Sequence, residues 1–338
     1  MPPRVDNDRE PEPRARTVVA GDVELHVLEA GEGFPVVLAH GFPDLAYTWR
    51  HQIPTLAREG YRAVALDQRG YGRSSRPEAV DAYDIYHLTD DLLRLLDDLG
   101  EERAVFVGHD WGALVVWALA QIAPERMAGV VALGVPFLPR GTTLPTTMLR
   151  QFAGDQWFLL LYVQEPGIAE ADLGRDVRAT LRRMLAGLTE EAIVASRPPG
   201  DHRGIVDRLD PVAVLPPWLA PDELDHYVSE FSRTGFTGGL NWFRNFDRNW
   251  RLTRHLAGAT IDVPSLFVAG EDDPLLSACP PALMDGWLND HRGTVLIEGA
   301  SHWVHQEKPD AVTATLLGFL TDVAPREASP TPTRAPAT

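Results

Sequence analysis

Short apolar runs alternate along the chain with segments of helical spacing, and this alternation leaves few folds open. The runs have the length and continuity of strands buried on both faces of a sheet, and they lie at 35–39, 63–66, 104–107 and 130–133. Helical spacing occurs between them, at 88–99 and 111–122. Strands that alternate with helices predict a parallel sheet with right-handed crossovers. An apolar alternation over 18–27 predicts an antiparallel hairpin in front of it.

The alternation stops near Pro136 and resumes near Ile261. Two later runs, 264–269 and 294–297, predict two more buried strands, and 310–320 predicts a closing helix. We therefore expect an α/β fold in which one mostly parallel sheet domain is interrupted by a helical cap. The expected boundaries are 15–135 and 256–324 for the sheet domain, 136–255 for the cap, and 1–14 and 325–338 for flexible tails without apolar periodicity.

Charge and cysteine content exclude several classes of protein. The chain has 48 acidic and 31 basic residues, a formal charge of −17, which argues against a nucleic-acid or membrane partner. One cysteine, Cys279, excludes a disulfide framework and a cysteine-rich zinc site. No apolar run approaches the roughly 18 residues of a membrane span, and the start lacks the order of a signal peptide. We expect a soluble, cytoplasmic protein.

The sharpest local signal is an aspartate bounded by glycines between a buried run and a helix. Asp110 is the centre of Gly108-His109-Asp110-Trp111-Gly112, directly after the run 104–107. Glycines there permit a tight turn that presents the central side chain at the carboxyl end of a sheet, beside a helix N-terminus. The pattern has the form of a nucleophile elbow with aspartate as the nucleophile. For an isolated motif, an N-capping aspartate is the alternative.

An upstream strand end fits the same kind of enzyme. His40-Gly41-Phe42-Pro43 follows the run 35–39, where elbow enzymes keep the second half of their oxyanion hole. The backbone N–H groups of Phe42 and Trp111 are therefore expected to converge on one oxygen. His40 is expected to hold this loop by hydrogen bonds.

Two downstream strand ends complete a candidate triad. Asp273 follows the run 264–269, and His302 follows the run 294–297. Taken alone, Asp273 could be an ordinary turn carboxylate, and His302 could be an ordinary surface histidine. The order nucleophile, acid, histidine is nevertheless the one expected for an elbow enzyme.

With these motifs, the chain resembles the soluble-type epoxide hydrolases of the α/β-hydrolase fold. The resemblance runs from about residue 23 to 320 and includes the motifs at 40–43, 67–75, 108–112 and 299–303. Residues 164–167 and 235–245 look like the cap of the same family. The resemblance implies an α/β-hydrolase fold whose helical cap covers the nucleophile.

The resemblance also implies a reaction in two steps. Asp110 attacks a saturated carbon and forms an alkyl ester. His302, oriented by Asp273, then activates water to attack the carbonyl of that ester, and the Phe42 and Trp111 amides hold the oxyanion. The expected outcome is the opening of an epoxide to a diol. No cofactor or metal is expected, because histidines and carboxylates lack metal-ligand spacing.

The cap departs from the family pattern at two positions. Family members usually supply two cap tyrosines that protonate the oxygen of the opening ring. The corresponding positions here are Leu159 and Phe243. Another cap side chain is one candidate replacement, and those close in sequence are Trp157, Tyr162, Trp242 and Tyr227, although core packing is the commoner role of such aromatics.

A different substrate would remove the need for a cap acid. If the chain is a haloalkane or haloacid-type dehalogenase, the leaving group is a halide, which needs no proton. Haloalkane dehalogenases of this fold also keep a tryptophan directly after the nucleophile, where Trp111 stands here. An indole N–H is a donor that can stabilise a halide. An activated substrate, or an ester or lactone, would also need no such acid. Some proteins of this fold are receptors or scaffolds, but the intact set of Asp110, Asp273 and His302 favours catalysis. The aromatic cap predicts a small-molecule substrate that is bulky and apolar or aromatic, and a homodimer is left open.

Overall fold

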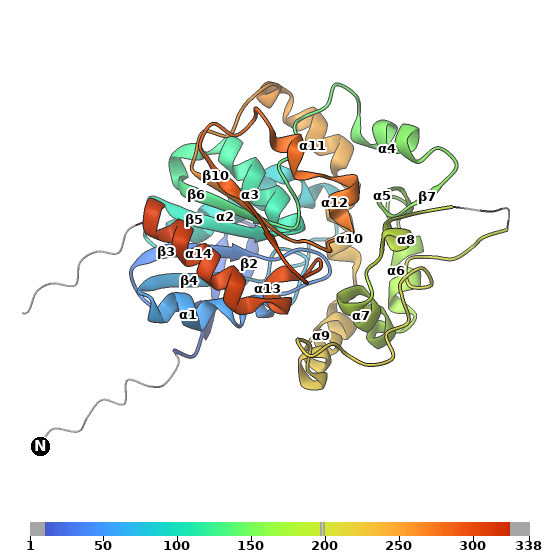
Figure 1. Ribbon diagram of the computed structural model, residues 1–338, viewed down its shortest axis with the longest axis horizontal. Helices are drawn as coiled ribbons and strands as arrows, with labels where there is room; N and C mark the ends of the chain where they lie inside the picture. The colour runs from blue at the N-terminus through green and yellow to red at the C-terminus, as the bar shows by residue number, and fades with distance from the viewer. Residues whose placement is uncertain (1–10, 197, 199, 325–338) are drawn as a thin grey trace, which may run out of the picture.

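The computed structural model describes residues 11–196, 198 and 200–324. An eight-stranded sheet with the order β1-β2-β4-β3-β5-β6-β9-β10 lies at its centre (Figure 1). The strands are β1 (Arg14–Ala20), β2 (Val23–Ala30), β3 (Phe34–Ala39), β4 (Tyr61–Leu66), β5 (Ala104–His109), β6 (Met127–Leu133), β9 (Ser265–Gly270) and β10 (His291–Ile297). β1 and β2 form an antiparallel hairpin, β2 pairs antiparallel with β4, and the other pairs are parallel. The predicted hairpin and mostly parallel sheet are confirmed.

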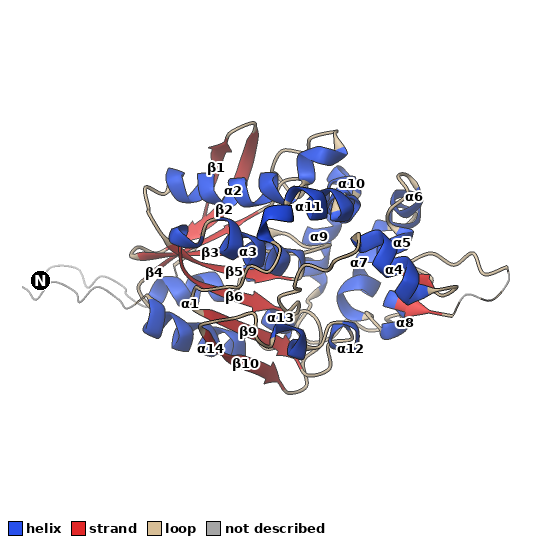
Figure 2. Ribbon diagram, turned by 90° about the horizontal axis from the view of Figure 1, so that it is seen from above, coloured by secondary structure: helices blue, strands red, loops and turns tan. Residues whose placement is uncertain are grey.

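Helices cover both faces of the sheet, as Figure 2 shows. α2 (Ile85–Asp98) and α3 (Trp111–Ile122) lie on one face, and α1 (Gln52–Arg58) and α14 (Pro309–Val323) lie on the other. Neighbouring strand residues serve different faces: Val37 packs in the cluster with α2 and α3, whereas Val36 packs with α1 and α14. Because successive strand side chains point to opposite faces, each apolar run fills two cores at once.

β10 differs from the strand expected at 294–297. It is an edge strand whose residues alternate between exposed and half-buried up to Ile297. Val295 packs against the core beneath α14, but Leu296 on the opposite face is 49% exposed. The prediction of burial on both faces is wrong here, because an edge strand has a neighbour on one side alone and part of it faces solvent.

The insertion leaves the sheet after β6 and returns at β9, and it gathers beyond one end of the sheet (Figure 1). It contains α4 (Pro145–Ala153), β7 (Trp157–Phe158), α5 (Leu159–Tyr162), α6 (Ile168–Gly174), α7 (Val177–Ala186), α8 (Glu190–Ile193), β8 (Val194–Ala195), α9 (Pro221–Thr234), α10 (Thr237–Arg244), α11 (Phe246–Leu252) and the 3₁₀ helix η4 (Arg254–Leu256). The cap boundaries predicted at 136 and 255 fall in this connection and stay a prediction. Of the predicted tails, 1–10 and 325–338 lie outside the described residues, and because Arg14 begins β1, the predicted first tail extends too far.

The end of the insertion is fastened to the sheet domain. The Ile85 amide donates to Asn249 Oδ1 at 2.8 Å, and Arg248 pairs with Asp84 at 2.9 Å. Both contacts join α11 to the start of α2.

The remaining short elements of the sheet domain are η1 (Ala46–Trp49), η2 (Val80–Tyr83), η3 (Pro124–Arg126), α12 (Leu275–Ala278), η5 (Pro281–Met284) and α13 (Val304–Glu307).

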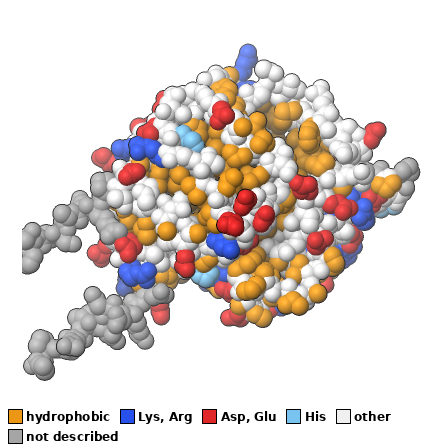
Figure 3. Space-filling view, viewed as in Figure 1, with side chains coloured by type: hydrophobic (Ala, Val, Ile, Leu, Met, Phe, Trp, Pro, Cys, Tyr) orange, Lys and Arg blue, Asp and Glu red, His pale blue; other side chains and the backbone are white. Residues whose placement is uncertain are grey.

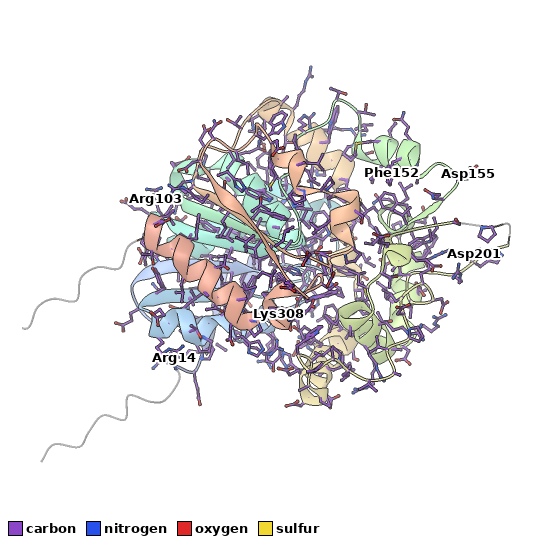
Figure 4. The ribbon with its side chains drawn as sticks, in the orientation of Figure 1. Arg14, Arg103, Phe152, Asp155, Asp201 and Lys308 are labelled. Atoms are coloured by element: carbon purple, nitrogen blue, oxygen red, sulfur yellow. The ribbon has the colours of Figure 1, made fainter. Side chains whose placement is uncertain are left out.

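The surface matches the composition. Figure 3 shows acidic and hydrophobic side chains interspersed over one face, with few Lys or Arg. Figure 4 places Phe152 and Asp155 at the outer end of the insertion, away from Arg103 at the opposite end of the molecule. Within the part of the chain that is described, no helix combines the length and the apolar character needed to cross a membrane.

Candidate active site

Asp110 occupies a strained turn between β5 and α3. Its backbone has φ 52° and ψ −117°, and it is the one non-glycine residue with positive φ among the described residues. The glycines around it are required by close approach: a Cβ on Gly108 would lie 2.2 Å from the carbonyl oxygen of Gly112, and a Cβ on Gly112 would lie 2.2 Å from that of Ala39. Strain of this kind persists where the surrounding structure enforces it, typically at functional sites.

The three residues of the predicted triad lie together. His302 Nδ1 is 3.0 Å from Asp273 Oδ2, and His302 Nε2 is 3.6 Å from Asp110 Oδ2. The other oxygen of Asp273 accepts the Leu275 amide at 2.9 Å, which fixes the carboxylate behind the ring. The loop after β9, the loop after β10 and the elbow after β5 thus meet at the carboxyl ends of their strands.

Solvent reaches one member of this set more than the others. The side chain of Asp110 is 17% exposed, whereas His302 is 3% and Asp273 0% exposed. Asp110 is therefore the member of the set that solvent reaches, while His302 and Asp273 are shielded from water.

Electrostatics favour an ion pair in the resting site. Burial disfavours a charged His302, but the charges and hydrogen bonds of Asp273 and Asp110 outweigh burial and raise the pKa of His302 to about 10. Burial also opposes ionisation of Asp110, yet the hydrogen bond and charge of His302 and the Phe42 amide lower the pKa of that carboxyl. At neutral pH the site holds an imidazolium between two carboxylates.

The Phe42 amide, one of the two predicted oxyanion donors, contacts Asp110. The Phe42 amide donates to Asp110 Oδ1 at 2.8 Å. Trp111 begins α3 directly after the nucleophile, but in the described part of the chain its amide makes no hydrogen bond to the Asp110 carboxylate. Trp111 as second donor therefore stays a prediction.

His40 holds the Phe42 loop from below. Its Nδ1–H donates to the Gly41 carbonyl at 2.8 Å, and its Nε2 accepts the Gln68 amide at 3.1 Å. Burial lowers the pKa of His40 to about 4, against the opposing charges of Asp67 and Asp110, so the ring is neutral. The structural role predicted for His40 agrees with these bonds.

Aromatic rings of the insertion lie over the oxyanion loop and the elbow. Phe243 packs edge-on against Phe42 at 5.3 Å and against Trp111 at 5.0 Å between ring centroids. Phe246 stacks on Trp111 at 5.3 Å. Five cap residues are predicted to contact the substrate: Trp157, Leu159, Tyr162, Trp242 and Phe243. Of these, Phe243 packs against both Phe42 and Trp111.

Leu159 packs against the large core cluster that contains Phe243. It begins α5 and is half-buried. Gln164 bridges the two helices, because its amide donates to the carbonyls of Leu160 and Phe243 at 2.8 and 3.1 Å. The two positions at which the family usually carries tyrosine thus present hydrocarbon side chains from adjacent helices.

The other cap candidates turn their polar atoms elsewhere or leave them unused. The Trp242 indole N–H donates to the Arg69 carbonyl at 3.3 Å. Burial and the neighbouring Asp172 carboxylate raise the pKa of the Tyr162 hydroxyl to about 12. The indole N–H of Trp157 is buried without a protein partner within the described chain, and its ring lies 4.5 Å from the Arg208 guanidinium. These contacts give Trp242 and Tyr162 packing roles.

Two contacts at the site are not indicated by any sequence pattern. The Tyr227 hydroxyl donates to Asp44 Oδ1 at 2.9 Å, so a cap helix is tied to the loop two residues beyond Phe42. His109 Nε2–H donates to the His302 carbonyl at 2.8 Å. Both contacts join segments far apart in the sequence, and no local signal could have found them.

Comparisons with known proteins agree with this geometry. Residues 35–309 match the family described as alpha/beta hydrolase fold. The chain is 55% identical over 322 residues to "Epoxide hydrolase A" of Mycobacterium tuberculosis (91% of this chain, 98% of the relative), and 36% identical over 313 residues to "Epoxide hydrolase 1" of Siraitia grosvenorii (90% and 97%). The crystal structure of Epoxide Hydrolase A from Mycobacterium thermoresistibile superposes with a TM-score of 0.87 at 53% identity and covers 91% of this chain and 98% of its own. The chain therefore belongs to the soluble-type epoxide hydrolases of the α/β-hydrolase fold.

Proposed function

We propose that this enzyme opens an epoxide to a diol through a covalent ester on Asp110. The observation that carries the proposal is the placement of Asp110 between two groups: the Phe42 amide donates to Oδ1, and Nε2 of His302 lies near Oδ2. The names of its relatives agree with epoxide as the substrate class. Asp110, His302 and Asp273 are the proposed catalytic residues, with Phe42 and Trp111 as oxyanion donors.

The two oxygens of Asp110 have different roles in the first step. Oδ1 is held by the Phe42 amide, which leaves Oδ2 free to attack a ring carbon. The new bond joins Oδ2 to that carbon, the ring carbon–oxygen bond breaks, and the ring oxygen leaves as an alkoxide that takes up a proton from solvent water. His302, which is protonated in the resting site, gives one proton back to solvent and becomes neutral. The product of the step is a hydroxyalkyl ester.

His302 acts in the second step. A neutral imidazole takes a proton from water, the oxygen of that water attacks the ester carbonyl, and the developing oxyanion lies where Phe42 donates. The intermediate collapses, the alkyl oxygen leaves with a proton, and Asp110 is regenerated. The diol therefore keeps Oδ2 of Asp110, and the carboxylate gains the oxygen from water.

Ester formation itself prepares His302 for this role. Two carboxylates raise the pKa of His302 in the resting site, against the effect of burial. Esterification removes the charge of Asp110 and leaves Asp273 alone, so the pKa of His302 falls. The ring then loses its proton more readily and becomes the base that the second step requires.

The cap composition supports aryl epoxides as the preferred substrates. Leu159 and Phe243 bring no hydroxyl, so ring opening lacks a phenolic acid at those positions. A ring carbon next to an aromatic group carries developing positive charge more readily, and its carbon–oxygen bond breaks with less help from an acid. Aromatic rings at Phe243, Phe246 and Trp111 fit such a group by edge and stacking contacts.

The covalent mechanism has a direct test with styrene oxide as the probe. A His302→Gln variant should accumulate an ester on the Asp110 peptide, seen as a mass increase equal to the epoxide. In one turnover of wild-type enzyme in ¹⁸O-water, the diol should carry unlabelled oxygen and Asp110 should gain label. Label that enters the diol directly in the first turnover contradicts the covalent route.

The same assay separates the other chemistries. Chloroalkanes and aryl esters are offered to the enzyme with Asp110→Asn as the inactive control. Release of halide together with no opening of epoxides would assign the enzyme to dehalogenation, and cleavage of esters alone would assign it to acyl chemistry. Binding of all probes without turnover would identify a receptor.

A further inference from the structure

Behind the catalytic residues lies a second group of polar side chains that the proposed reaction does not use. Asp44, His109 and His305 each offer a ligand atom, and these three atoms lie within 4.8 Å of one another. The side chains are closed off from solvent, at 0%, 1% and 0% exposure. The ring centroids of the two histidines are 4.5 Å apart.

Each of the three residues has one atom engaged and one atom free. Asp44 Oδ1 accepts the Leu45 amide and the Tyr227 hydroxyl, His109 Nε2–H donates to the His302 carbonyl, and His305 Nε2 lies 2.6 Å from the Thr48 hydroxyl. Asp44 Oδ2, His109 Nδ1 and His305 Nδ1 are buried and have no hydrogen-bond partner among the residues that the structure describes.

The free atoms are all electron-pair donors. His109 Nε2 carries its proton because it donates to a carbonyl, so Nδ1 has an open lone pair. If Nε2–H of His305 donates to the Thr48 hydroxyl, Nδ1 of His305 also has an open lone pair. Two imidazole nitrogens and one carboxyl oxygen are therefore buried without a hydrogen-bond partner among the described residues, and unsatisfied buried groups of this kind are costly.

We infer that Asp44, His109 and His305 form a binding site for a single divalent transition-metal ion of the Zn²⁺ class. Two histidines and one carboxylate match the ligand preference of such ions. Tetrahedral Zn²⁺ with ligands at about 2.1 Å sets them about 3.4 Å apart. The most distant pair must therefore close by about 1.4 Å, within the reach of side-chain rotation and a small loop movement.

The ion would lie next to all three catalytic segments. Asp44 follows Phe42 by two residues, His109 precedes Asp110, and His305 follows His302 by three. Sequence spacing predicts no metal here, because the ligands come from three separate segments. Closure of the ligands around an ion draws these segments together, so occupancy of the site inhibits turnover.

Binding is tested on the full chain, stripped with a chelator and exposed to Zn²⁺ or Co²⁺. Because the ligands are buried, loading is done both by incubation of the folded protein and by refolding in the presence of the metal. The expected result is one ion retained per chain after gel filtration, with a visible Co²⁺ absorption band of low-symmetry nitrogen and oxygen coordination. No retained ion under either loading condition overturns the inference.

Variants assign the ion to the cluster. His305→Gln and Asp44→Asn keep side-chain size and should each weaken binding by more than ~10-fold, the smallest loss expected even for a residue that only hydrogen-bonds a metal ligand. His255→Gln removes an exposed histidine and should leave binding unchanged. Folding of each variant is checked by thermal unfolding. Retention of the ion by both cluster variants, or its loss in His255→Gln, contradicts the assignment.

Activity gives an independent second readout that rests on the proposed function. Zn²⁺ should slow styrene oxide hydrolysis by wild-type enzyme, a chelator should restore it, and His305→Gln should respond less than wild type. If the enzyme proves to have another activity, the retained ion and the Co²⁺ spectrum still decide the metal site. Equal inhibition of wild type and His305→Gln contradicts inhibition through this cluster.

Discussion

At the scale of single residues, the active site is governed by the charge of Asp110. This carboxylate is both the proposed nucleophile and one of two anions that hold His302 in its protonated form. The charge of Asp110 therefore serves the proposed attack, and its loss on ester formation lowers the pKa of His302, so that the ring becomes available as a base. The consequence is a difference in the pKa of His302 between the free enzyme and the ester, which is accessible to measurement.

Asp110→Asn should lower the pKa of His302. In the wild type, burial lowers this pKa, but Asp273 and Asp110 outweigh it and set the value at about 10. Removing one of the two charges leaves burial less opposed. Titration of the His302 ring followed by NMR should show the drop, and Asp90→Asn, an exposed carboxylate on α2 paired with Arg94, should show none. An unchanged pKa would mean that Asp273 alone sets the protonation of the ring.

The raised pKa of His302 also makes the stability of the fold depend on pH. Since the pKa of His302 in the folded enzyme is raised above its ordinary value of 6.5, the bound proton stabilises the fold fully below about pH 6.5. That stabilisation is lost as pH rises through about 10. Asp110→Asn should flatten this alkaline decline in melting temperature.

The hydrocarbon side chains at Leu159 and Phe243 make a gain of activity testable. Leu159→Tyr combined with Phe243→Tyr places phenols at the two cap positions where the family usually carries tyrosine, and the Phe243 ring lies against Trp111 of the elbow. A general acid typically contributes about 10²–10⁴-fold, so we expect kcat/KM for alkyl epoxides to rise by ~10²-fold, with less gain for aryl epoxides. The rate should acquire an alkaline limb near pH ~10, the ordinary pKa of tyrosine. Leu160→Tyr, which adds the hydroxyl one residue along α5, is the control. No gain, or an equal gain in the control, contradicts the assignment.

At the scale of elements, three backbone segments pack so closely at the carboxyl ends of β3 and β5 that side chains would collide. A Cβ on Gly41 would lie 2.4 Å from both Cβ and Oδ1 of Asp110. Gly41 is therefore required by the approach of the oxyanion loop to the nucleophile, not by an unusual φ. The elbow and the loop form one unit that tolerates no added atom.

Gly41→Ala should reduce both turnover and stability. The new methyl group must push Asp110 away from the Phe42 amide, and a misplacement of about 1 Å costs about 10²-fold in rate. Overpacking by one methyl group costs about 1–3 kcal/mol in unfolding free energy. Gly141→Ala, where a Cβ meets no atom within 4 Å, is the matched control. Steady-state kinetics and thermal unfolding of both variants separate the two effects. Normal kcat in Gly41→Ala would show that the loop can yield.

The elements also differ in how far the sequence could predict them. The helix expected at 111–122 is α3, with these bounds, because its apolar pattern and the flanking glycines are local signals. The partners of the triad follow from strand ends in a parallel sheet, since these ends meet at one edge. The burial of β10 was mispredicted because its apolar residues resemble a buried strand, and only its place at the sheet edge exposes Leu296. The contacts of Asp44 with Tyr227 and of His305 with Thr48 could not be predicted, because the partners lie in distant segments.

At the scale of the whole molecule, helix α9 of the insertion is latched to the sheet domain next to the active site. Arg50 pairs with Glu223 at 2.6 Å, and Arg233 donates to the Gly72 carbonyl at 2.8 Å. Between them, the Tyr227 hydroxyl donates to Asp44. The side chains of the ion pair are 12% and 17% exposed, whereas the hydrogen bond is fully buried.

Tyr227→Phe tests this latch. Asp44 is a buried carboxyl whose pKa burial raises to about 7, although the Leu45 amide and the Thr48 and Tyr227 hydroxyls act in the opposite direction. A folded pKa above the unfolded one means that the fold binds the proton more tightly, so stability falls as pH rises from about 4 to about 7. Loss of the Tyr227 hydroxyl raises the folded pKa further and extends this fall to higher pH.

The deficit of Tyr227→Phe should therefore depend on pH. Unfolding in denaturant, in metal-free buffer, should show a loss of about 1–3 kcal/mol, the cost of an unsatisfied buried group, and the loss should be larger at about pH 9 than at about pH 5. Tyr86→Phe removes an exposed hydroxyl 3.3 Å from His255 and should cost little at either pH. A deficit equal at both pH values would mean that the hydroxyl serves packing alone. A larger deficit at high pH would place the attachment of the cap under the control of a single buried carboxyl, two residues from the oxyanion donor.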